Sequence, residues 1–196
     1  MKNYGAFALA FCLALALCIN SGGCAARPTS VPAQPTMPPN TTIPPNTTIP
    51  PSNPNIRLKL GDKAPEFSLQ DINGGTVVLS HQFVGGKVVI NMWWLRCHGC
   101  TDEMPYLQEF HKKWHEHGLT LLAINVYDTA EMIRDFAMRN GLTFTFLLDA
   151  QKNLNAAYTN AGVPTTFFLD SSGIVRAIKD GAFESTVAIE NIFQSY

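Results

Sequence analysis

Residues 87–100 read Lys-Val-Val-Ile-Asn-Met-Trp-Trp-Leu-Arg-Cys-His-Gly-Cys. Residues 87–94 form a mostly apolar run rich in β-branched and aromatic side chains, which is typical of a buried central strand. After the two cysteines, apolar side chains recur at helical spacing over residues 104–114, and Gly118 follows as a C-terminal cap. The sequence therefore predicts a strand that ends at a cysteine pair and continues directly into a helix.

The chain from residue 57 onward alternates strand and helix patterns. This order predicts an α/β fold in which helices flank a mixed central sheet and a β-hairpin extends it on the N-terminal side. The hairpin turns at Asn73-Gly74-Gly75, where the glycines permit a positive φ. Further strands are expected at Phe67–Leu69, Thr76–Leu79, Leu119–Val126, Phe144–Leu148, Thr165–Leu169 and Ile174–Lys179, and further helices at Thr129–Asn140, near Lys152–Thr159 and from about Ser185.

The N-terminus carries the pattern of an export signal. Residues 6–19 are all apolar and are preceded by Lys2. A helix of this length reaches about 21 Å, which is less than the roughly 30 Å of a hydrocarbon core, so a membrane-spanning helix is disfavoured. A basic start, a short apolar run and small residues after it are typical of a secretory signal, and residues 1–23 are assigned to it.

Cys24 directly follows Ser21-Gly22-Gly23, and small residues before a cysteine at this point resemble the lipobox of bacterial lipoproteins. The resemblance implies that Cys24 becomes the acylated first residue of a protein anchored at the extracytoplasmic face of a bacterial membrane. Ser21 stands where that motif usually has leucine. The alternative is cleavage near Ala26, which would leave a soluble periplasmic or secreted protein.

Residues 24–56 form a linker between this cysteine and a folded domain that is expected to cover residues 57–196. Ten of the 13 prolines lie in the linker, and Pro-Pro-Asn-Thr-Thr-Ile occurs twice in succession, at residues 38–43 and 44–49. Such a segment cannot build a core and is expected to run as an extended polyproline II spacer. A long spacer suits a domain that must stand away from a membrane.

The net charge and the number of cysteines exclude some classes of function. The net charge is -1, which provides no field for holding polyanions, so nucleic-acid binding is not expected. Of five cysteines, Cys12 and Cys18 leave with the signal and Cys24 is the predicted lipid attachment site, so Cys97 and Cys100 remain. A pair this close in sequence constrains little chain, so its expected use is redox chemistry. Zinc is the alternative, but a zinc site needs about four ligands and no second cysteine pair follows, so neither metal nor cofactor is expected.

The predicted junction of strand and helix activates the first cysteine. The first turn of a helix presents unsatisfied N–H groups and the positive end of the helix dipole, which stabilise a thiolate at Cys97. The pKa of Cys97 is therefore expected to lie below the usual ~8.5. Arg96 adds a fixed positive charge beside it, and His98 adds a partial one. Cys100 lies one turn further on and is placed to act as the resolving thiol.

Several segments around the cysteine pair share a pattern with one superfamily. They are Leu60-Gly61-Asp62-Lys63-Ala64-Pro65-Glu66-Phe67-Ser68-Leu69, Gly86-Lys87-Val88-Val89-Ile90-Asn91-Met92-Trp93, Glu103-Met104-Pro105, Gly162-Val163-Pro164-Thr165-Thr166, and Asp170 with Gly173. Together they resemble the thioredoxin superfamily, and the wider pattern resembles its membrane-tethered TlpA/ResA-like branch, which overlaps with the redoxin and AhpC/TSA group. The resemblance covers residues 60 to about 180 and implies a thioredoxin-like fold.

The resemblance also implies roles for individual residues. Pro164 is expected to be a cis-proline that faces the cysteine pair, and Val163 is expected to present its backbone to a bound substrate strand. Glu103 corresponds to a carboxylate near the two thiols, which would tune their pKa values and relay a proton to or from Cys100. The alternative for Glu103 is a first-turn acid that only complements the helix dipole.

The activity implied by the resemblance is that of an exported thiol–disulfide oxidoreductase. Cys97 would attack, a mixed disulfide would form, and Cys100 would resolve it. Oxidised or reduced exported proteins, apocytochrome c among them, are the expected substrates, and a membrane electron carrier would recycle the site. Arg96 stands where the family usually has tryptophan, so Arg96 and the unusual His98 are expected to select substrates differently. The direction of electron flow stays open.

Two other functions stay open. Residues 99–103 also resemble peroxiredoxins, which would make the chain a thiol peroxidase that uses Cys100. The positions three and seven before Cys100 hold Cys97 and Trp93, however, where a peroxidase has Thr or Ser and then Pro. The second alternative is a non-catalytic thioredoxin-like module that binds a partner chain, or copper or zinc through the dithiol and His98.

Overall fold

The computed structural model describes residues 57–152, 154, 158 and 162–196. The predicted signal, the lipid attachment site Cys24 and the proline-rich linker lie outside these residues, as does most of the helix predicted near residues 152–159. Within the described residues, no helix combines the length and the apolar character needed to cross a membrane.

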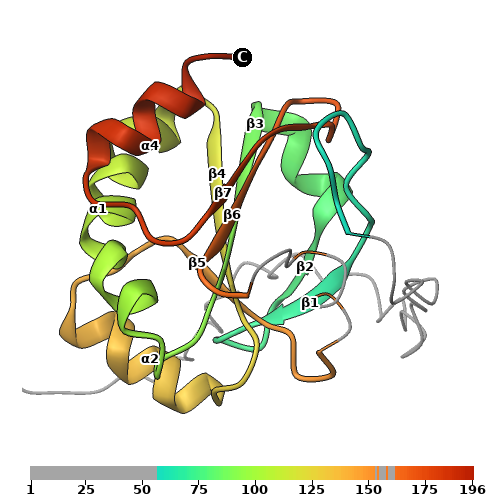
Figure 1. Ribbon diagram of the computed structural model, residues 1–196. Helices are drawn as coiled ribbons and strands as arrows, with labels where there is room; N and C mark the ends of the chain where they lie inside the picture. Colours follow the sequence, from blue (N-terminus) through green and yellow to red (C-terminus); the bar gives the residue numbers. More distant parts are fainter. Residues whose placement is uncertain (1–56, 153, 155–157, 159–161) are drawn as a thin grey trace, which may run out of the picture. The chain divides into compact units, whose positions relative to one another are not determined.

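A seven-stranded mixed sheet forms the centre of the described part of the domain, in the order β2-β1-β5-β4-β3-β6-β7 (Figure 1). β3 lies between β4, which is parallel to it, and β6, which is antiparallel. The hairpin of β1 and β2 extends this sheet, because β1 pairs with β5. The predicted mixed sheet with its N-terminal hairpin is confirmed. Its strands are β1 (Ser68–Asp71), β2 (Thr76–Val78), β3 (Lys87–Trp93), β4 (Leu119–Asn125), β5 (Thr145–Leu148), β6 (Thr165–Leu169) and β7 (Val175–Asp180).

Three α-helices pack against one face of the sheet (Figure 1). Their apolar side chains join a core cluster with Val89 and Trp93 of β3. On the opposite face, the 3-10 helix η1 contributes Leu79 to a second cluster, in a stretch where the sequence predicted only the end of a strand. The helical elements are η1 (Leu79–Gly85), α1 (His98–Trp114), η2 (His115–His117), α2 (Ala130–Arg139) and α4 (Thr186–Phe193).

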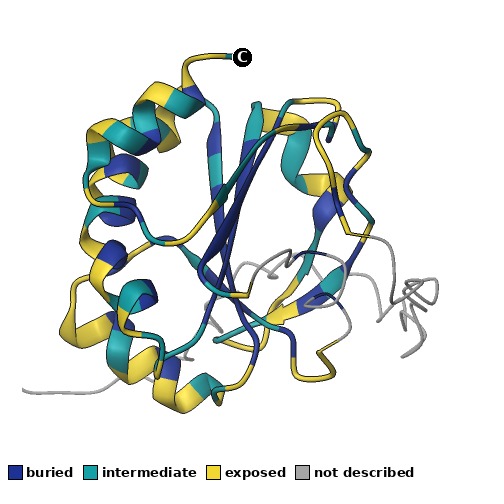
Figure 2. Cartoon of the chain, viewed as in Figure 1, coloured by how far each residue is buried: buried dark blue, intermediate teal, exposed yellow. Residues whose placement is uncertain are grey.

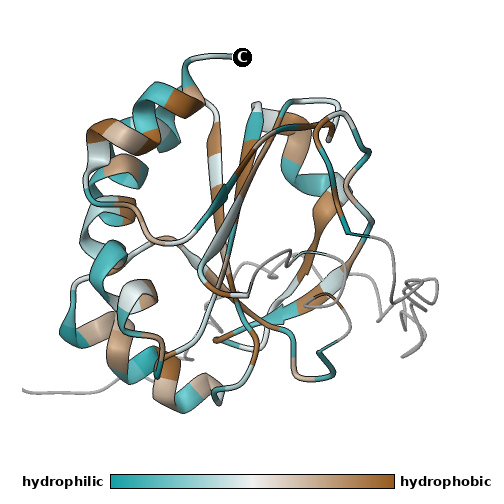
Figure 3. Ribbon diagram, in the orientation of Figure 1, coloured by the Kyte–Doolittle hydropathy of each residue, from teal (hydrophilic) through white to brown (hydrophobic). Residues whose placement is uncertain are grey.

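β3 is buried on both faces, as the central strand of an α/β sheet must be. Val88, Ile90 and Met92 point to the cluster on the η1 side, whereas Val89 and Trp93 point to the cluster under the helices. Figure 2 shows this strand and its neighbours buried in the middle of the domain, and Figure 3 shows apolar residues along the same strands. The strand that leads to the cysteine pair is therefore held rigidly from two sides.

Aromatic side chains fix the end of β3 just before the cysteine pair. The ring of Trp93 is fully buried, and its centroid lies 5.6 Å from that of Phe136 on α2 and 5.5 Å from that of Phe146 on β5. Trp94 is half-buried, and the centroid of its ring lies 4.9 Å from that of the exposed Tyr127. Such aromatic pairs contribute about 0.5–1.5 kcal/mol each beyond their burial.

Two glycine-containing turns meet at the starts of β3 and β4. Gly118 has a φ of 85°, and a Cβ atom there would lie 2.3 Å from the carbonyl oxygen of Gly85. Gly86 makes the reciprocal approach, since its Cβ would lie 2.5 Å from the carbonyl oxygen of Gly118. The contact aligns Lys87 with Leu119, the first pair of the parallel β3–β4 register. Only glycine permits both the backbone conformation and the close approach.

Gly118→Ala is therefore expected to destabilise the domain by clearly more than Gly141→Ala. Gly141 has a φ of 62°, but nothing lies within 4 Å of a Cβ built there, so its substitution costs only the left-handed backbone, about 1–2 kcal/mol. Gly118→Ala adds a collision with the backbone of Gly85, and roughly 3 kcal/mol or more is expected in total. Denaturant unfolding of both variants measures the difference, and equal losses would contradict the close approach.

Candidate active site

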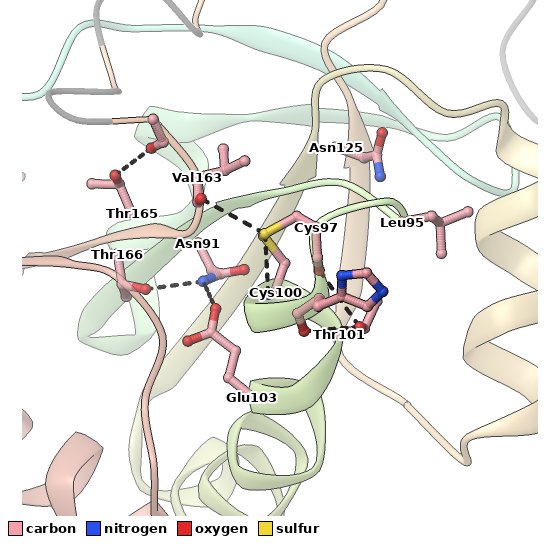
Figure 4. Close-up of a disulfide and its surroundings, with 12 residues drawn as sticks. Asn91, Leu95, Cys97, Cys100, Thr101, Glu103, Asn125, Val163, Thr165 and Thr166 are labelled. Carbon is pink, nitrogen blue, oxygen red and sulfur yellow. Dashed lines mark hydrogen bonds between the residues drawn. A yellow bond between two sulfur atoms is a disulfide. The ribbon is translucent and has the colours of Figure 1, made fainter.

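The two cysteines lie at the junction between β3 and α1 (Figure 4). Cys97 is the N-cap of α1, and its sulfur accepts a hydrogen bond from the backbone N–H of Cys100 at 3.2 Å. The pair forms a disulfide with a Cα–Cα distance of 5.2 Å. The two sulfurs differ in access, because Cys97 is half-buried whereas Cys100 is fully buried. Only Cys97 can therefore meet a partner molecule first.

A hydrogen-bonded loop from β4 supports the turn that carries Cys97. Asp128 accepts the backbone N–H of Leu95 at 2.7 Å and the side-chain amide of Asn125 at 2.9 Å. The side-chain oxygen Oδ1 of Asn125 in turn accepts the backbone N–H groups of Tyr127 and Asp128. Because β3 and β4 are parallel, their C-terminal ends meet at one edge of the sheet, which brings these loops together. Sequence reasoning did not single out this support.

Val163 and Pro164 face the disulfide from the start of β6. The peptide bond between them is cis, the isomer that the resemblance implied. The carbonyl oxygen of Val163 lies 3.6 Å from the sulfur of Cys97, as Figure 4 shows. Pro164 is buried and Val163 is half-buried. The structure thus brings both of these predicted residues to the more exposed of the two sulfurs.

Glu103 lies beneath the cysteine pair, and the alternative that it is a first-turn acid is wrong. The first turn of α1 contains no acidic residue, and Glu103 comes in the second turn with its side chain fully buried. Its Oε1 accepts the side-chain amide of Asn91 at 2.8 Å, and its Oε2 accepts the backbone N–H of Phe183 at 2.9 Å. Glu103 is therefore a buried group bound between β3 and the segment after β7, not an acid at the exposed start of the helix.

Burial raises the pKa of Glu103 to about 7, while the hydrogen bonds from Phe183 and Asn91 and the charge of Lys179 act in the opposite direction. Desolvation penalises the charged form, and its effect exceeds the sum of the others here. A carboxyl group with a pKa near neutrality exchanges a proton readily at physiological pH. Glu103 is thus suited to proton transfer next to a pair of thiols.

Asn91 is a site residue that sequence reasoning missed. It lies in the middle of β3 on the face toward α1, and its amide nitrogen donates both to Glu103 and to the hydroxyl of Thr166 at 2.9 Å. The carbonyl oxygen of the Asn91 side chain is buried without a hydrogen-bond partner among the described residues. Figure 4 shows the amide between Glu103 and the disulfide. One polar residue inside an otherwise apolar strand was the signal available in the sequence.

Arg96 and His98 flank Cys97 on the exposed side of the site. Both side chains are exposed, and the hydroxyl of Thr101 donates to the backbone carbonyl of His98 at 3.0 Å. The guanidinium of Arg96 and the imidazole of His98 therefore lie at the surface that a partner molecule would approach. The expected lowering of the Cys97 pKa concerns the dithiol form of the protein and stays a prediction.

Glu103→Gln is expected to remove a pH dependence from the stability of the oxidised protein. Because folding raises the pKa of Glu103 from 4.5 to about 7, the folded state holds a proton that the unfolded state has lost between these pH values. The contribution of Glu103 is fully present below pH 4.5 and is lost as the pH rises through about 7. The free energy of unfolding of the unmodified chain should fall by about 3 kcal/mol over this window relative to Glu103→Gln.

Chemical unfolding at a series of pH values measures this difference. Glu190→Gln is the matched control, because a hydrogen bond from Lys113 lowers the pKa of that partly exposed carboxyl. The control should keep the fall between pH 4.5 and 7 that Glu103→Gln removes. Parallel curves for the unmodified chain and Glu103→Gln would contradict the raised pKa.

Comparison with known proteins agrees with this geometry. Residues 60–178 match the AhpC/TSA family. The chain is 37% identical over 122 residues to the thiol–disulfide oxidoreductase ResA of Geobacillus kaustophilus, which covers 62% of this chain and 70% of that protein. It is 30% identical over 127 residues to the ResA of Bacillus subtilis, which covers 65% of this chain and 70% of that protein.

The fold is shared with solved structures as well. StoA from Bacillus subtilis superposes with a TM-score of 0.56 at 24% identity, over 67% of this chain and 98% of StoA. This likeness concerns the fold, and it confirms the predicted thioredoxin-like architecture. The chain thus belongs to the AhpC/TSA family and, within it, to the thioredoxin-like thiol–disulfide oxidoreductases that include ResA.

Proposed function

We propose that this thiol–disulfide oxidoreductase is exported and exchanges the Cys97–Cys100 pair with protein substrates. The observation that carries the proposal is the unequal access of the two sulfurs at the start of α1, with Cys97 half-buried beside Val163 and Cys100 fully buried. A protein substrate needs one accessible nucleophile and one protected resolving thiol. This pair meets both needs.

The exchange proceeds in two steps when the dithiol is the reductant. The Cys97 thiolate attacks one sulfur of a substrate disulfide, which forms a mixed disulfide and releases the other substrate sulfur as a thiolate. Cys100 then loses its proton and attacks the sulfur of Cys97, which forms the internal disulfide and releases the second substrate thiolate. Two electrons pass from the dithiol to the substrate, and the same steps in reverse oxidise a substrate dithiol.

Glu103 serves as the proton acceptor for Cys100 in this proposal. It follows Cys100 by three residues on the same face of α1, so the two side chains are neighbours on the helix. Its pKa of about 7 lies between that of an ordinary carboxyl and that of an ordinary thiol. The carboxylate can therefore take the Cys100 proton during resolution and return it when the disulfide is opened again.

The substrate side of the site consists of Val163, Pro164, Arg96 and His98. We assign the backbone of Val163, which lies just before β6 with its carbonyl oxygen toward Cys97, to pair with an extended substrate segment. Arg96 presents a positive charge where the family usually has tryptophan, and the exposed His98 lies on the other side of Cys97. We assign exported proteins with exposed disulfides or thiols as substrates, apocytochrome c among them. A membrane electron carrier would restore the pair after each turnover.

A peroxidase that uses Cys100 as its nucleophile fits the site less well. The side chain of Cys100 is fully buried and lies against the apolar cluster beneath the helices. Peroxide would have to reach a sulfur that Cys97 shields. The family match to AhpC/TSA keeps this alternative worth testing beside the main proposal.

Cys100→Ser is expected to trap the mixed disulfide. The reduced variant should accumulate a covalent adduct with insulin through Cys97, and its turnover of insulin should fall by a factor on the order of 10² or more, because the resolving thiol is missing. Mass spectrometry of the intact adduct and the insulin turbidity assay measure the two effects. Cys97→Ser is the matched control and should form no adduct.

Two outcomes of this experiment would contradict the proposal. An adduct that forms through Cys100 in the Cys97→Ser variant would reverse the assigned order of attack. Rapid hydrogen peroxide turnover that Cys100→Ser abolishes and Cys97→Ser retains would make the chain a peroxidase. Neither result is expected for a buried Cys100.

Cys24→Ala is expected to release the protein from the membrane. In a bacterial host, the unmodified chain should sediment with membranes and incorporate labelled fatty acid, because acylation of Cys24 supplies the anchor. The variant should do neither, while its purified domain keeps insulin reduction. Recovery of the unmodified chain in the soluble periplasmic fraction, cleaved near Ala26, would contradict the lipid anchor.

A further inference from the structure

The side chain of Lys179, near the end of β7, folds back onto the backbone that follows it. Its ammonium donates to three successive carbonyl oxygens, at 2.7 Å to Asp180, 3.0 Å to Gly181 and 3.3 Å to Ala182. An ammonium group has three N–H donors, so this segment uses all of them. A lysine on a sheet-edge strand usually extends into water instead.

The N–H groups of the same segment point the other way, into the active site. The backbone N–H of Gly181 donates to the carbonyl oxygen of Pro164 at 2.9 Å. The backbone N–H of Phe183 donates to Oε2 of Glu103, also at 2.9 Å. Two peptide groups therefore bind Lys179 with their oxygens while their N–H groups bind the two sides of the site.

We propose that Lys179 is a positioning residue that favours the carboxylate form of Glu103 through the peptide group between Ala182 and Phe183. The ammonium binds the oxygen of this peptide, and the carboxylate accepts its N–H. The inference rests on the proposed role of Glu103 as the proton acceptor for Cys100. It adds the group that sets how readily Glu103 gives up its own proton.

The alignment of charges explains how Lys179 acts without touching Glu103. A peptide dipole has its negative end at oxygen and its positive end at N–H, so a cation at the oxygen and an anion at the N–H both stabilise it. The ammonium polarises the peptide and makes its N–H a stronger donor. Because Glu103 is fully buried, this interaction is screened far less than it would be at the surface. The positive charge of Lys179 lowers the pKa of Glu103 against the larger effect of burial.

The other charged groups near this segment do not replace Lys179. The carboxylate of Asp180 is directed to the hydroxyl of Thr165, at 3.2 Å. The remaining partners of Glu103 among the described residues, Asn91 and the Phe183 amide, are uncharged. Lys179 is therefore the cation whose loss should change the charge state of Glu103.

The segment after β7, which binds the Lys179 ammonium, also contacts the turn that carries the cysteine pair. A Cβ atom at Gly99, between the two cysteines, would lie 3.4 Å from the Cβ of Ala182, so the segment packs against the turn of the cysteine pair. Gly181 has a φ of 80°, which lets successive carbonyls converge on one ammonium. Lys179 thus stabilises a turn that contacts the first turn of α1, Pro164 and Glu103 together.

The test is a carboxyl-carbon NMR titration of Glu103 in the oxidised protein, with the signal assigned by its loss in Glu103→Gln. Lys179→Met should raise the measured pKa of Glu103 by about one pH unit, the lower end of the effect of a nearby opposite charge. Lys179→Arg keeps the charge and should raise it by clearly less. Lys113→Met removes a lysine of similar size that pairs with Glu190 and should leave it unchanged. An unchanged Glu103 pKa in Lys179→Met would overturn the inference.

A measurement on the unmodified protein covers the case in which Lys179→Met does not fold. The Phe183 amide and the carbon next to the Lys179 ammonium should both titrate with the midpoint of Glu103. A flat response of either signal would overturn the inference. Insulin reduction, measured in parallel, separates this idea from the proposed function. If the expected titration is seen but the protein does not reduce insulin, only the proposed function is contradicted. If the protein reduces insulin but the expected titration is absent, only the role of Lys179 is contradicted.

Discussion

The hydrogen bond from the Cys100 amide to the Cys97 sulfur depends on only four residues lying between the end of β3 and the start of α1. A charge at a helix N-terminus gains about 0.3–1 kcal/mol from the dipole, and up to ~2 kcal/mol when partly buried. For a two-electron couple, 1.4 kcal/mol corresponds to about 30 mV. The dipole therefore raises the reduction potential by some tens of millivolts, which makes the pair more oxidising. Known members of this fold span about 150 mV. A difference of that size between proteins of one fold needs more than the helix dipole, so the other charges around such a pair matter as well.

Among these charges, the ionised form of Glu103 carries the largest desolvation penalty, because its side chain is fully buried. A carboxylate without water needs partners on both oxygens, and the chain supplies them from β3 and from the segment after β7. These partners compensate only in part, because the pKa of Glu103 still rises to about 7. The same incomplete compensation reduces stability at neutral pH and, in the proposed function, makes the group a useful proton acceptor. A fully satisfied Glu103 would have an ordinary pKa and would hold a thiol proton too weakly.

The strand, the cysteine pair and the following helix could be predicted because each rests on a local pattern. The bounds of β6 agree residue for residue with the expectation, and those of β3 and β4 differ by one residue at their C-terminal ends. The supports of the site could not be predicted in this way. Asn91 and Glu103, which are hydrogen-bonded, lie 12 residues apart in the sequence, and Glu103 and Phe183 lie 80 residues apart. No local sequence pattern encodes hydrogen bonds over such separations. A polar residue within an apolar run indicates only that some partner exists.

The charges on the two sides of the disulfide are of opposite sign, and this orders the two thiols. Arg96 and the helix N-terminus lie on the side of Cys97, where positive charge favours a thiolate. Glu103 lies on α1, one turn along from the buried Cys100, on the side where negative charge and low polarity favour a protonated thiol. In the proposed function, Cys97 is therefore the nucleophile, and Cys100 attacks only after its proton has passed to the carboxylate. The delay gives the mixed disulfide a lifetime, during which contacts at Val163 and Arg96 can distinguish one substrate from another.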